Sequence, residues 1–310
     1  MSATYYIGVD GSGPSRAALR WGVRRAAERD AAVVLVNTVD EEWGLVGRDA
    51  AAAAEAQARE LLAEESDRVS ALHTGIRLTT RIVHGGTAWA LAALPSPEDL
   101  LIVGTHKTGF LRGRVLGSRS VQIASAARCS VAIVPDTTLD SRHDVVVGVD
   151  GTEGCLAAVR QGALEADRLD QDLLLVYAPP AALRSDPSRS ELSRATTNRA
   201  DPVDDRSSQT ARLMHNAAAV AAATSSRITV RRRVARRDPA EALLDASFDA
   251  ALLILGVSSR HGENTLIGSV THDVLMNINV PVLIARGTAA SGGTTSLASP
   301  ASVIGAPSVQ

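Results

Sequence analysis

The sequence contains an internal repeat, and this repeat constrains the fold more than any other feature. The segment YIGVDGSGPSRAALRWG, which begins at Tyr6, is echoed by VVGVDGTEGCLAAVRQG, which begins at Val146, an offset of 140 residues. The same offset aligns Leu35 with Leu175 in the next apolar run. A repeat of this length indicates a duplicated domain, so the 310-residue chain is expected to form two similar halves.

The offset changes along the chain and locates the extra residues of the second half. It grows to 152 where Gly104 aligns with Gly256, and it falls to 151 where Gly117 aligns with Gly268. A segment rich in Ser, Pro, Asp and Arg explains the growth, and we interpret it as a mobile surface insertion at about 179–210. The predicted boundaries are a first domain at 1–138, a second domain at 143–287 and a disordered, small and polar tail at 288–310.

Each half alternates short apolar runs with longer segments of helical periodicity. Runs such as LLIV and ALLIL are apolar without interruption, which is typical of strands buried on both faces of a sheet. The stretch SRAALRWGVRRAAERD places Leu19 and Val23 at helical spacing and predicts an amphipathic helix. The alternation predicts the α/β class, with two tandem doubly wound sandwich domains that each contain a five-stranded parallel sheet.

Composition narrows the class of protein. Hydrophobic residues make up 45% and charged residues 21% of the chain, with 34 Asp and Glu against 32 Lys and Arg. This balance favours neither a nucleic-acid partner nor a membrane surface, and no apolar stretch is long enough to span a bilayer. The two cysteines form no disulfide framework or zinc pattern, and the N-terminus has no features of an export signal. We therefore expect a cytoplasmic protein.

Two loops in each half have the composition of a ligand site. In doubly wound sheets, ligands bind beyond the carboxyl ends of the strands, where the strand order reverses. The loop after the predicted fourth strand contains Lys107 and ends in Gly117, Ser118, Arg119 and Ser120 at a predicted helix start. Glycines, helix N-terminal amides and hydroxyls together suit a phosphate group. The second copy of the loop keeps the glycines and hydroxyls of this pattern: Gly256, Gly268, Ser269 and Thr271.

Both halves resemble the universal stress protein family, and only the linker, the insertion and the tail lie outside the match. The family's nucleotide-binding pattern is G-x-x-G, nine residues, then G-S/T. Gly104, Gly117 and Ser118 stand at these spacings, but Lys107 occupies the position of the second glycine. The second half has Ser259 there, and its loop is one residue shorter. The resemblance implies an adenine nucleotide alpha hydrolase-like fold that binds an adenine nucleotide, namely ATP with or without Mg²⁺.

The resemblance also implies which residues contact the nucleotide. Asp10 and Asp150, which end the first strand of each half, are expected to contact the adenosine part, and the residues after the third glycine are expected to contact phosphate. In the first half the implied site comprises Asp10, Gly11, Ser12, Thr38, Val103, Gly104, Lys107, Gly117, Ser118, Arg119 and Ser120. In the second half it comprises Asp150, Gly151, Thr152, Ala178, Leu255, Gly256, Gly268, Ser269, Val270 and Thr271.

Several of these features also have a purely structural interpretation. An aspartate followed by Gly and Ser or Thr is a common turn and helix cap, which accounts for Asp10 and Asp150 without a ligand. The basic run at 231–238 lies on a predicted strand and is interpreted as a solvated or acid-paired face. No histidine or cysteine spacing indicates a metal site, so none is expected. Three residues are interpreted as core or interface packing: Trp21, Trp43 and Trp89.

Three functions are compatible with the sequence. The first is an ATP-binding stress-response regulator, in which the nucleotide biases conformation or partner contacts without rapid turnover. The second is a nucleotide-free interaction or dimerisation protein with degenerate phosphate loops, and the third is a slow ATPase or nucleotidyl-transfer enzyme. The sequence has neither a GxSxG elbow nor a Walker loop, so we expect a protein that is not an enzyme, with slow ATP hydrolysis left open.

The family commonly pairs its domains through the last strand of the sheet. The resemblance therefore implies that the runs VAIV and VPVLIA carry a contact between the halves or between chains. An exposed apolar edge strand also invites aggregation, which is a physical reason to expect it covered. The expected partners are an adenine nucleotide, a second domain in a homodimer or within the same chain, and an unidentified regulatory protein, with neither nucleic acid nor membrane among them.

Overall fold

The computed structural model describes residues 3–40, 48–105, 118–137, 142–179, 202–257 and 267–287. The described part of the first half contains five strands: β1 (Thr4–Gly8), β2 (Ala32–Val39), β3 (Leu78–His84), β4 (Leu100–Thr105) and β5 (Ser130–Pro135). The described part of the second half also contains five: β6 (Val145–Gly148), β7 (Leu173–Tyr177), β8 (Val230–Val234), β9 (Leu252–Gly256) and β10 (Val282–Ala285). Strands β4, β5, β9 and β10 lie on the apolar runs LLIV, VAIV, ALLIL and VPVLIA, which confirms those predictions, whereas the outer strands β3 and β8 are largely exposed.

Helices connect the strands in both halves. They are α1 (Gly13–Glu28), α2 (Arg48–Leu72), α3 (Thr87–Ala92), α4 (Ser118–Ala126), α5 (Glu153–Leu169), α7 (Pro202–Thr224), α8 (Pro239–Ala246) and α9 (Ser269–Met276). The start of α1 follows from its sequence, because Ser12 caps the helix and Pro14 occupies the first turn, where a missing N–H costs nothing.

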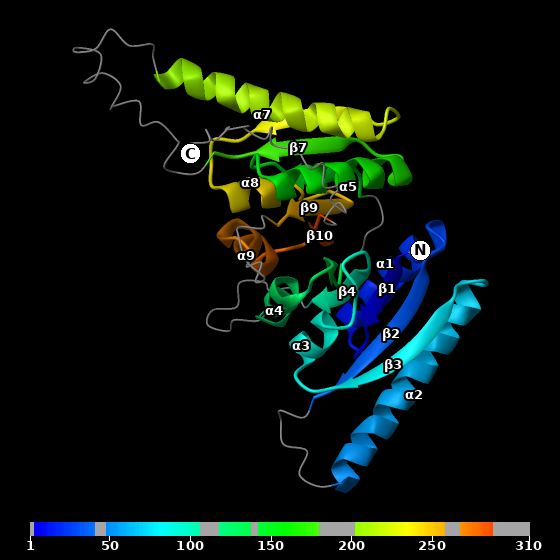
Figure 1. Cartoon of the computed structure of the whole chain (residues 1–310). Coiled ribbons are helices and arrows are strands. Elements are labelled where there is room, and N and C mark those ends of the chain that lie inside the picture. Colours follow the sequence, from blue (N-terminus) through cyan, green and yellow to red (C-terminus); the bar gives the residue numbers. More distant parts are fainter. Residues whose placement is uncertain are drawn as a thin grey trace, which may run out of the picture.

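The described strands form one continuous sheet in the order β3-β2-β1-β4-β5-β10-β9-β6-β7-β8. Within each half all neighbouring strands are parallel, as the alternation of strands and helices predicts. The two five-stranded sheets join where β5 pairs with β10 in antiparallel orientation, so the halves share one ten-stranded sheet (Figure 1). The expected contact through the last strands therefore forms within the chain.

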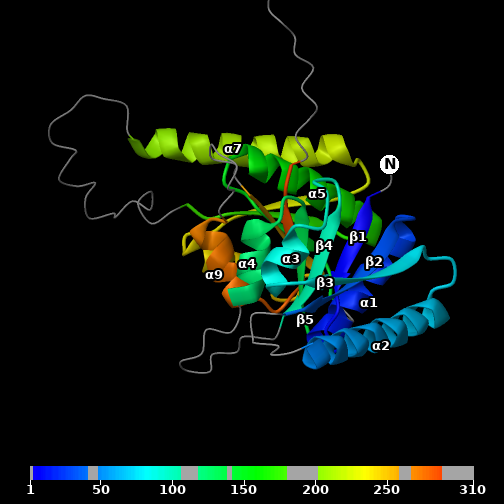
Figure 2. The same ribbon diagram turned by 60° about the horizontal axis from the view of Figure 1, so that its bottom comes forward.

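Two apolar cores cover the two faces of this sheet, and each core continues across both halves. One core includes Leu19 of α1, Leu62 of α2 and Met214 of α7, and the other includes Leu91 of α3 and Val274 of α9. Helices α1, α2, α5 and α7 thus cover one face, and α3, α4, α8 and α9 cover the other. Figure 2 shows α2 and α7 lying near opposite ends of the sheet.

Some predicted boundaries lie elsewhere, and others fall outside the described residues. Helix α7 begins at Pro202, so the predicted insertion at 179–210 extends too far toward the C-terminus. Proline is favoured in the first turn of a helix, and here it begins a helix in a segment that we interpreted as irregular. The tail at 288–310 lies outside the described residues, as does the core of the insertion at 180–201. In the described part of the chain, no helix is long and apolar enough to cross a membrane.

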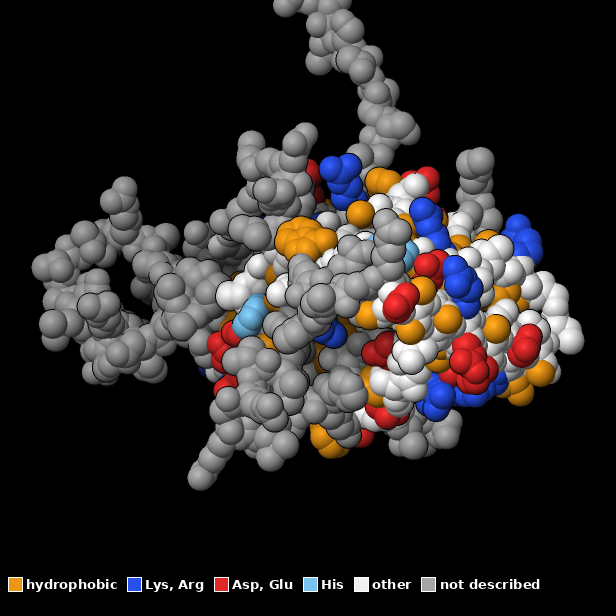
Figure 3. Space-filling view, turned by 90° about the horizontal axis from the view of Figure 1, so that it is seen from below, with side chains coloured by type: hydrophobic (Ala, Val, Ile, Leu, Met, Phe, Trp, Pro, Cys, Tyr) orange, Lys and Arg blue, Asp and Glu red, His pale blue; other side chains and the backbone are white. Residues whose placement is uncertain are grey.

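Side-chain predictions outside the site had mixed outcomes. Arg231 on the outer strand β8 forms ion pairs with Asp144 and Asp172, which confirms the acid-paired interpretation for this residue. Trp21 packs against the core, as expected, whereas Trp89 is 68% exposed and therefore lies outside the core, so that only its interface interpretation stays a prediction. Trp43 lies outside the described residues. On the face shown in Figure 3, acidic and basic side chains are interspersed over the described surface.

Candidate functional site

The carboxyl edge of each half-sheet contains a point where the strand order reverses. In the first half this point lies between β1 and β4, which are neighbours in the sheet, and in the second half it lies between β6 and β9. Connections leave these paired strands in opposite directions, which opens a crevice beyond their ends. The carboxyl ends of the first and fourth strands of each half therefore lie side by side, as the sequence predicts, while the loops at 106–117 and 258–266 lie outside the described residues.

The loop after the first strand has the same geometry in both halves. The carboxylate Oδ1 of Asp10 accepts a hydrogen bond from the Ser12 amide at 2.9 Å, and Oδ1 of Asp150 accepts one from the Thr152 amide at 2.9 Å. Ser12 and Thr152 cap α1 and α5 by accepting hydrogen bonds from amides three residues ahead. Both aspartates therefore act in the turn, as the structural interpretation expects, and they stand at the carboxyl edge as the nucleotide hypothesis requires.

Glycines in this loop are required by backbone shape and by a covering helix. Gly11 and Gly151 have φ values of 77° and 84°, a region that other residues rarely adopt. A Cβ atom at Gly11 would lie 3.2 Å from Leu61 of α2, and one at Gly151 would lie 2.9 Å from Leu213 of α7. Helices α2 and α7 thus pack directly over the two loops, and a side chain at either glycine would require the covering leucine to shift.

The first glycine of the predicted phosphate loop has a packing role that sequence reasoning missed. A Cβ at Gly104 would lie 2.3 Å from the carbonyl of Pro14, and one at Gly256 would lie 2.3 Å from the carbonyl of Gly154. These glycines let the N-termini of α1 and α5 approach the ends of β4 and β9. The structure shows that they admit a helix N-terminus, and the expected close approach of an anion stays a prediction.

An open pocket lies beside the end of β2, where Thr38 is a predicted site residue. Its volume is about 280 Å³, and the Thr38 hydroxyl is a buried polar group without a hydrogen-bond partner in the described structure. The Asn37 amide donates to the Val9 carbonyl at 2.6 Å and so ties the end of β2 to the end of β1. The lining residues are Asn37, Thr38, Val39, Asp40, Ala54, Gln57, Ala58 and Leu61.

Most of this pocket could not be found from the sequence. Asp40, Gln57 and Leu61 carry no motif, and they meet only because α2 packs over the edge of β2. Leu61 also covers Gly11, so the pocket and the loop after β1 share a wall. In the second half the predicted counterpart of Thr38 is Ala178, which is half-buried.

The predicted phosphate-contacting residues lie at the starts of α4 and α9. Arg119 and Ser269 are exposed, whereas Ser120 and Thr271 are only 6% and 7% exposed. Gly268 adopts the extended geometry of an N-cap but supplies no side-chain cap to α9. Val270 is half-buried, and Val103 and Leu255 are buried strand residues. Lys107, Gly117 and Ser259 lie outside the described residues, as does the Ser118 side chain at the start of α4.

The ionisable groups of the described residues do not form a metal centre. No group of three or more His, Cys, Asp or Glu side chains that could hold a metal ion occurs in the described ranges. Burial raises the pKa of the Cys129 thiol to about 11, and burial also raises the pKa of the Cys155 thiol. Both thiols are therefore protonated at neutral pH and behave as small core side chains.

Comparisons with known proteins agree with this architecture. The universal stress protein family matches the chain twice, at residues 5–135 and 141–286. A universal stress protein of Mycolicibacterium smegmatis is 28% identical over 311 residues, which cover 92% of this chain and 98% of the relative. A universal stress protein of Mycobacterium tuberculosis is 28% identical over 302 residues, covering 90% and 96% of the two chains.

A solved structure supports the same fold. The crystal structure of a universal stress protein from Archaeoglobus fulgidus aligns with a TM-score of 0.65 at 15% identity, covering 92% of this chain and 99% of that chain. The two matches of the family together span most of the sequence and coincide with the two halves of the sheet. The chain therefore belongs to the universal stress protein family, with one family domain in each half.

Proposed function

We propose that each half binds an adenine nucleotide, ATP, at its carboxyl edge, and that the bound nucleotide biases conformation or partner contacts without rapid turnover. The observation that carries this proposal is the position of the loops. In each half the loop after the first strand and the glycine-rich loop after the fourth strand leave neighbouring strands, at the reversal of strand order. Ligands of doubly wound sheets bind at this point.

The pocket at the end of β2 suits the adenosine part of the ligand. Its volume of about 280 Å³ is close to the lower end of the range for small-molecule sites, which is roughly 300 Å³. Thr38 lines this pocket, and its buried hydroxyl has no hydrogen-bond partner among the described residues, a costly state that a ligand hydrogen bond would relieve once the side chain turns toward the pocket. The Asp40 and Gln57 side chains add polar groups to the same wall.

The starts of α4 and α9 suit the phosphate part. Helix N-terminal amides attract anions, and Gly268 leaves the first amides of α9 without a side-chain cap. Arg119 in the first turn of α4 is exposed and supplies a positive charge that α9 lacks in its first turn, where Val270 is aligned. We therefore expect the first half to bind the triphosphate more tightly than the second.

A second candidate function is an interaction protein that binds no nucleotide. Two observations favour it: the Asp10 and Asp150 carboxylates already accept hydrogen bonds from their own turns, and the Ser120 and Thr271 side chains are buried. On this alternative, the carboxyl edges are retained for packing, and the two halves act only through their surfaces.

The test separates the two candidates by counting nucleotides. The chain is purified without added nucleotide and denatured, and the released small molecules are identified and counted by chromatography and mass. About two ATP per chain support both sites, and about one supports the first half. No released nucleotide, together with no heat of binding in Mg-ATP titrations, contradicts the proposal and leaves the interaction protein.

A variant pair assigns the site. Gly117→Ala with Ser118→Ala removes a close backbone approach and one donor, so ATP binding at the first site should weaken by about tenfold, or about 1.4 kcal/mol. The titration is done with the second site disabled by Gly268→Ala and Ser269→Ala. Ser70→Ala, an exposed change on α2, is the matched control and should leave the affinity unchanged. Lys107→Gly then tests the role of that lysine. If Lys107 obstructs the phosphate, the variant should bind ATP more tightly, and if Lys107 contacts the phosphate, the variant should bind ATP more weakly.

A further inference from the structure

The two halves meet around an approximate two-fold axis that strand pairing locates. Residues 131–133 of β5 align with residues 282–284 of β10 at an offset of 151. The strands run antiparallel, with Ala132 directly opposite Leu283. Ala132 therefore lies opposite the residue with which it is aligned in the other half. The axis therefore passes through this pair, and both residues are fully or almost fully buried.

The same relation holds for the helices α1 and α5 above this pair. Arg25 and Glu165 are aligned at the offset of 140, and they form a bidentate ion pair with each other. Glu28 and Arg168 are also aligned at 140, and they too form an ion pair with each other. Arg25 and Glu28 of the first half thus each lie opposite the aligned residue of the second half across the axis, as Ala132 does.

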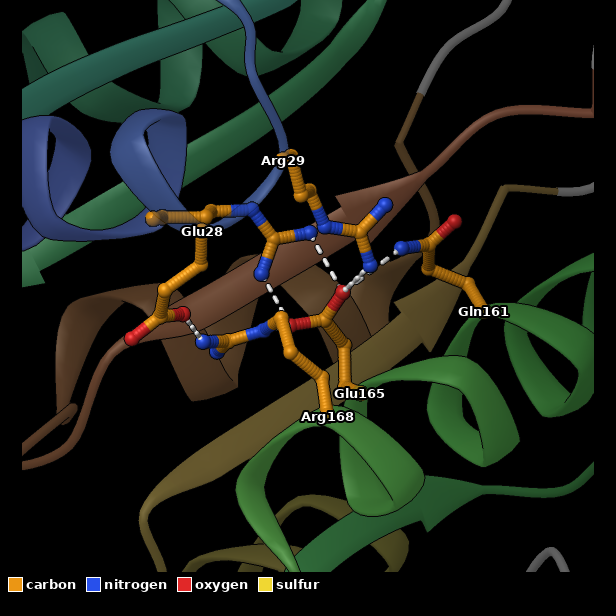
Figure 4. Close-up of polar contacts among 6 residues, drawn as sticks. Glu28, Arg29, Gln161, Glu165 and Arg168 are labelled. Atoms are coloured by element: carbon orange, nitrogen blue, oxygen red, sulfur yellow. Dashed lines mark hydrogen bonds and ion pairs between the residues drawn. The ribbon is translucent and has the colours of Figure 1, made fainter. Parts of the chain in front are cut away.

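The ion pairs form one cluster, which Figure 4 shows around the Glu165 carboxylate, with a buried centre and with Glu28 and Arg29 partly exposed at its edge. The Glu165 side chain is fully buried and the Arg25 side chain is 4% exposed. Arg29 also contacts Glu165 Oε1 at 2.6 Å, and Arg168 contacts Oε2 at 3.1 Å. Burial opposes ionisation of Glu165, but the three guanidinium groups outweigh it and hold the pKa of this carboxyl below its ordinary value.

The residues one helical turn before Arg25 and Glu165 stabilise the opposite charges of these two side chains. Trp21 lies four residues before Arg25, and its ring centre is 5.2 Å from the guanidinium carbon, a distance suited to a cation–π contact. The aligned residue in α5 is Gln161, whose amide donates to Glu165 Oε1 at 3.0 Å. Each half therefore supports the charge that it presents, with an aromatic face under the cation and a hydrogen-bond donor beside the carboxylate.

Two identical halves could not make this interface. A pair of first halves would place Arg25 against Arg25 and Ala132 against Ala132, with like charges buried and a gap in the sheet core. A pair of second halves would place Glu165 against Glu165 and Leu283 against Leu283, with like charges buried and the core overfilled. Buried like charges cost several kcal/mol, and both under- and overpacking destabilise a core.

We propose that the residues on this axis make each half's pairing face selective for the other half, so that the chain pairs internally and rejects the like-with-like pairing of a homodimer. The first half presents Arg25, Glu28 and Ala132, and it fits a partner face that presents Glu, Arg and a large aliphatic side chain at the matching positions. A buried ion pair contributes little net stability compared with an apolar contact of the same shape, but it discriminates strongly against a mismatched partner.

The test uses the full chain and keeps its composition and net charge constant. Arg25→Glu with Glu28→Arg gives the first half the charges of the second, and Glu165→Arg with Arg168→Glu gives the second half the charges of the first. Each two-residue variant therefore mimics a like-with-like pair. The four-residue variant combines both changes and restores the Arg25–Glu165 and Glu28–Arg168 ion pairs with their charges exchanged.

Hydrogen exchange of β5 and β10 measures pairing, since opening the junction exposes these amides while β1 and β6 stay inside their own half-sheets. We expect each two-residue variant to exchange β5 and β10 at least tenfold faster than the unaltered chain, with β1 and β6 unchanged. The four-residue variant should return to within about threefold of the unaltered chain. Light scattering should find the unaltered chain at a single-chain mass near 32.3 kDa.

Defined outcomes overturn the proposal. It fails if either two-residue variant keeps β5 and β10 within threefold of the unaltered chain. It also fails if the four-residue variant is no better protected than the two-residue variants, including the case in which none of the three folds. Glu55→Arg with Arg59→Glu exchanges an exposed ion pair on α2 and is the matched control, which should leave exchange unchanged.

Discussion

The two halves of this chain agree in their turns and differ in the side chains by which they pack. In both halves an aspartate, a glycine of positive φ and a hydroxyl cap close the loop after the first strand. In both, a glycine at the end of the fourth strand admits the N-terminus of the first helix. Duplication has thus preserved contacts that depend on backbone shape, because few other residues can replace a glycine there.

Packing between helices shows the opposite behaviour. In the first half Arg16 Nε contacts Glu65 Oε1 at 2.9 Å, which joins α1 to α2, and the Glu65 side chain is fully buried. The aligned positions of the second half hold Leu156 and Ala217, and Ala217 belongs to the apolar core. The same helix packing is therefore maintained by an ion pair in one half and by apolar contact in the other. Side-chain chemistry was free to diverge as long as the two partners changed together.

The largest effect is expected where the halves differ most, at the pairing axis. Glu165→Gln should reduce the free energy of unfolding by about 3–5 kcal/mol, because it leaves Arg25 buried without a counter-charge. Urea unfolding of the full chain measures the loss. Glu55→Gln, in an exposed ion pair of α2, is the control and should change stability by less than about 1 kcal/mol. Equal losses in the two variants would contradict the central role of the axis.

The same carboxylate predicts how stability depends on pH. The Glu165 pKa is lower in the folded chain than its ordinary value of 4.5, so ionised Glu165 stabilises the fold at all pH values above 4.5. This contribution is lost as the pH falls through 4.5 toward the folded pKa. The stability difference between the unaltered chain and Glu165→Gln should therefore be constant near neutral pH and shrink in acid. A difference that grows below pH 4.5 would reverse the assigned sign.

An intermediate effect is expected at the glycines that the halves share. Gly104→Ala and Gly256→Ala should each cost about 1–3 kcal/mol, since the new Cβ would meet a helix backbone carbonyl at 2.3 Å. Gly268→Ala is the matched control, because a Cβ there meets nothing within 4 Å. Thermal unfolding of the three variants checks the order. If Gly104→Ala and Gly256→Ala differ from each other by more than the control differs from the unaltered chain, the two turns are not equivalent.

The smallest effect is expected when the first half is made to resemble the second. Arg16→Leu with Glu65→Ala should change stability by less than about 1 kcal/mol, because apolar residues can replace an ion pair at little net cost. Glu65→Ala alone should cost more than the double variant, although Arg16 is 41% exposed and can turn to water. Denaturant unfolding of both variants makes the comparison. A double variant less stable than the single one would mean that the ion pair has no apolar substitute in this half.

Much of the fold could be predicted from the sequence, and the site could be predicted in part. Apolar runs located the central strands β4, β5, β9 and β10, since a strand buried on both faces leaves an uninterrupted pattern. The ends of the first and fourth strands lie next to each other in each half, as predicted, because topology alone brings them together. The pocket residues Gln57 and Leu61 could not be predicted, since they reach the site only through the packing of α2. The predicted nucleotide contacts of Asp10, Asp150 and the α4 and α9 starts stay predictions.

The sequence by itself determined the duplication, the α/β class, the strand positions and the turns, because periodicity and glycine or aspartate signals act over a few residues. Only the tertiary structure decided that the halves join through β5 and β10 within one chain. It alone also showed that Arg25 meets Glu165, that Glu28 meets Arg168 and that Ala132 meets Leu283. These residues lie about 140–151 positions apart, and the choice between pairing partners depends on side chains that become neighbours only around the axis.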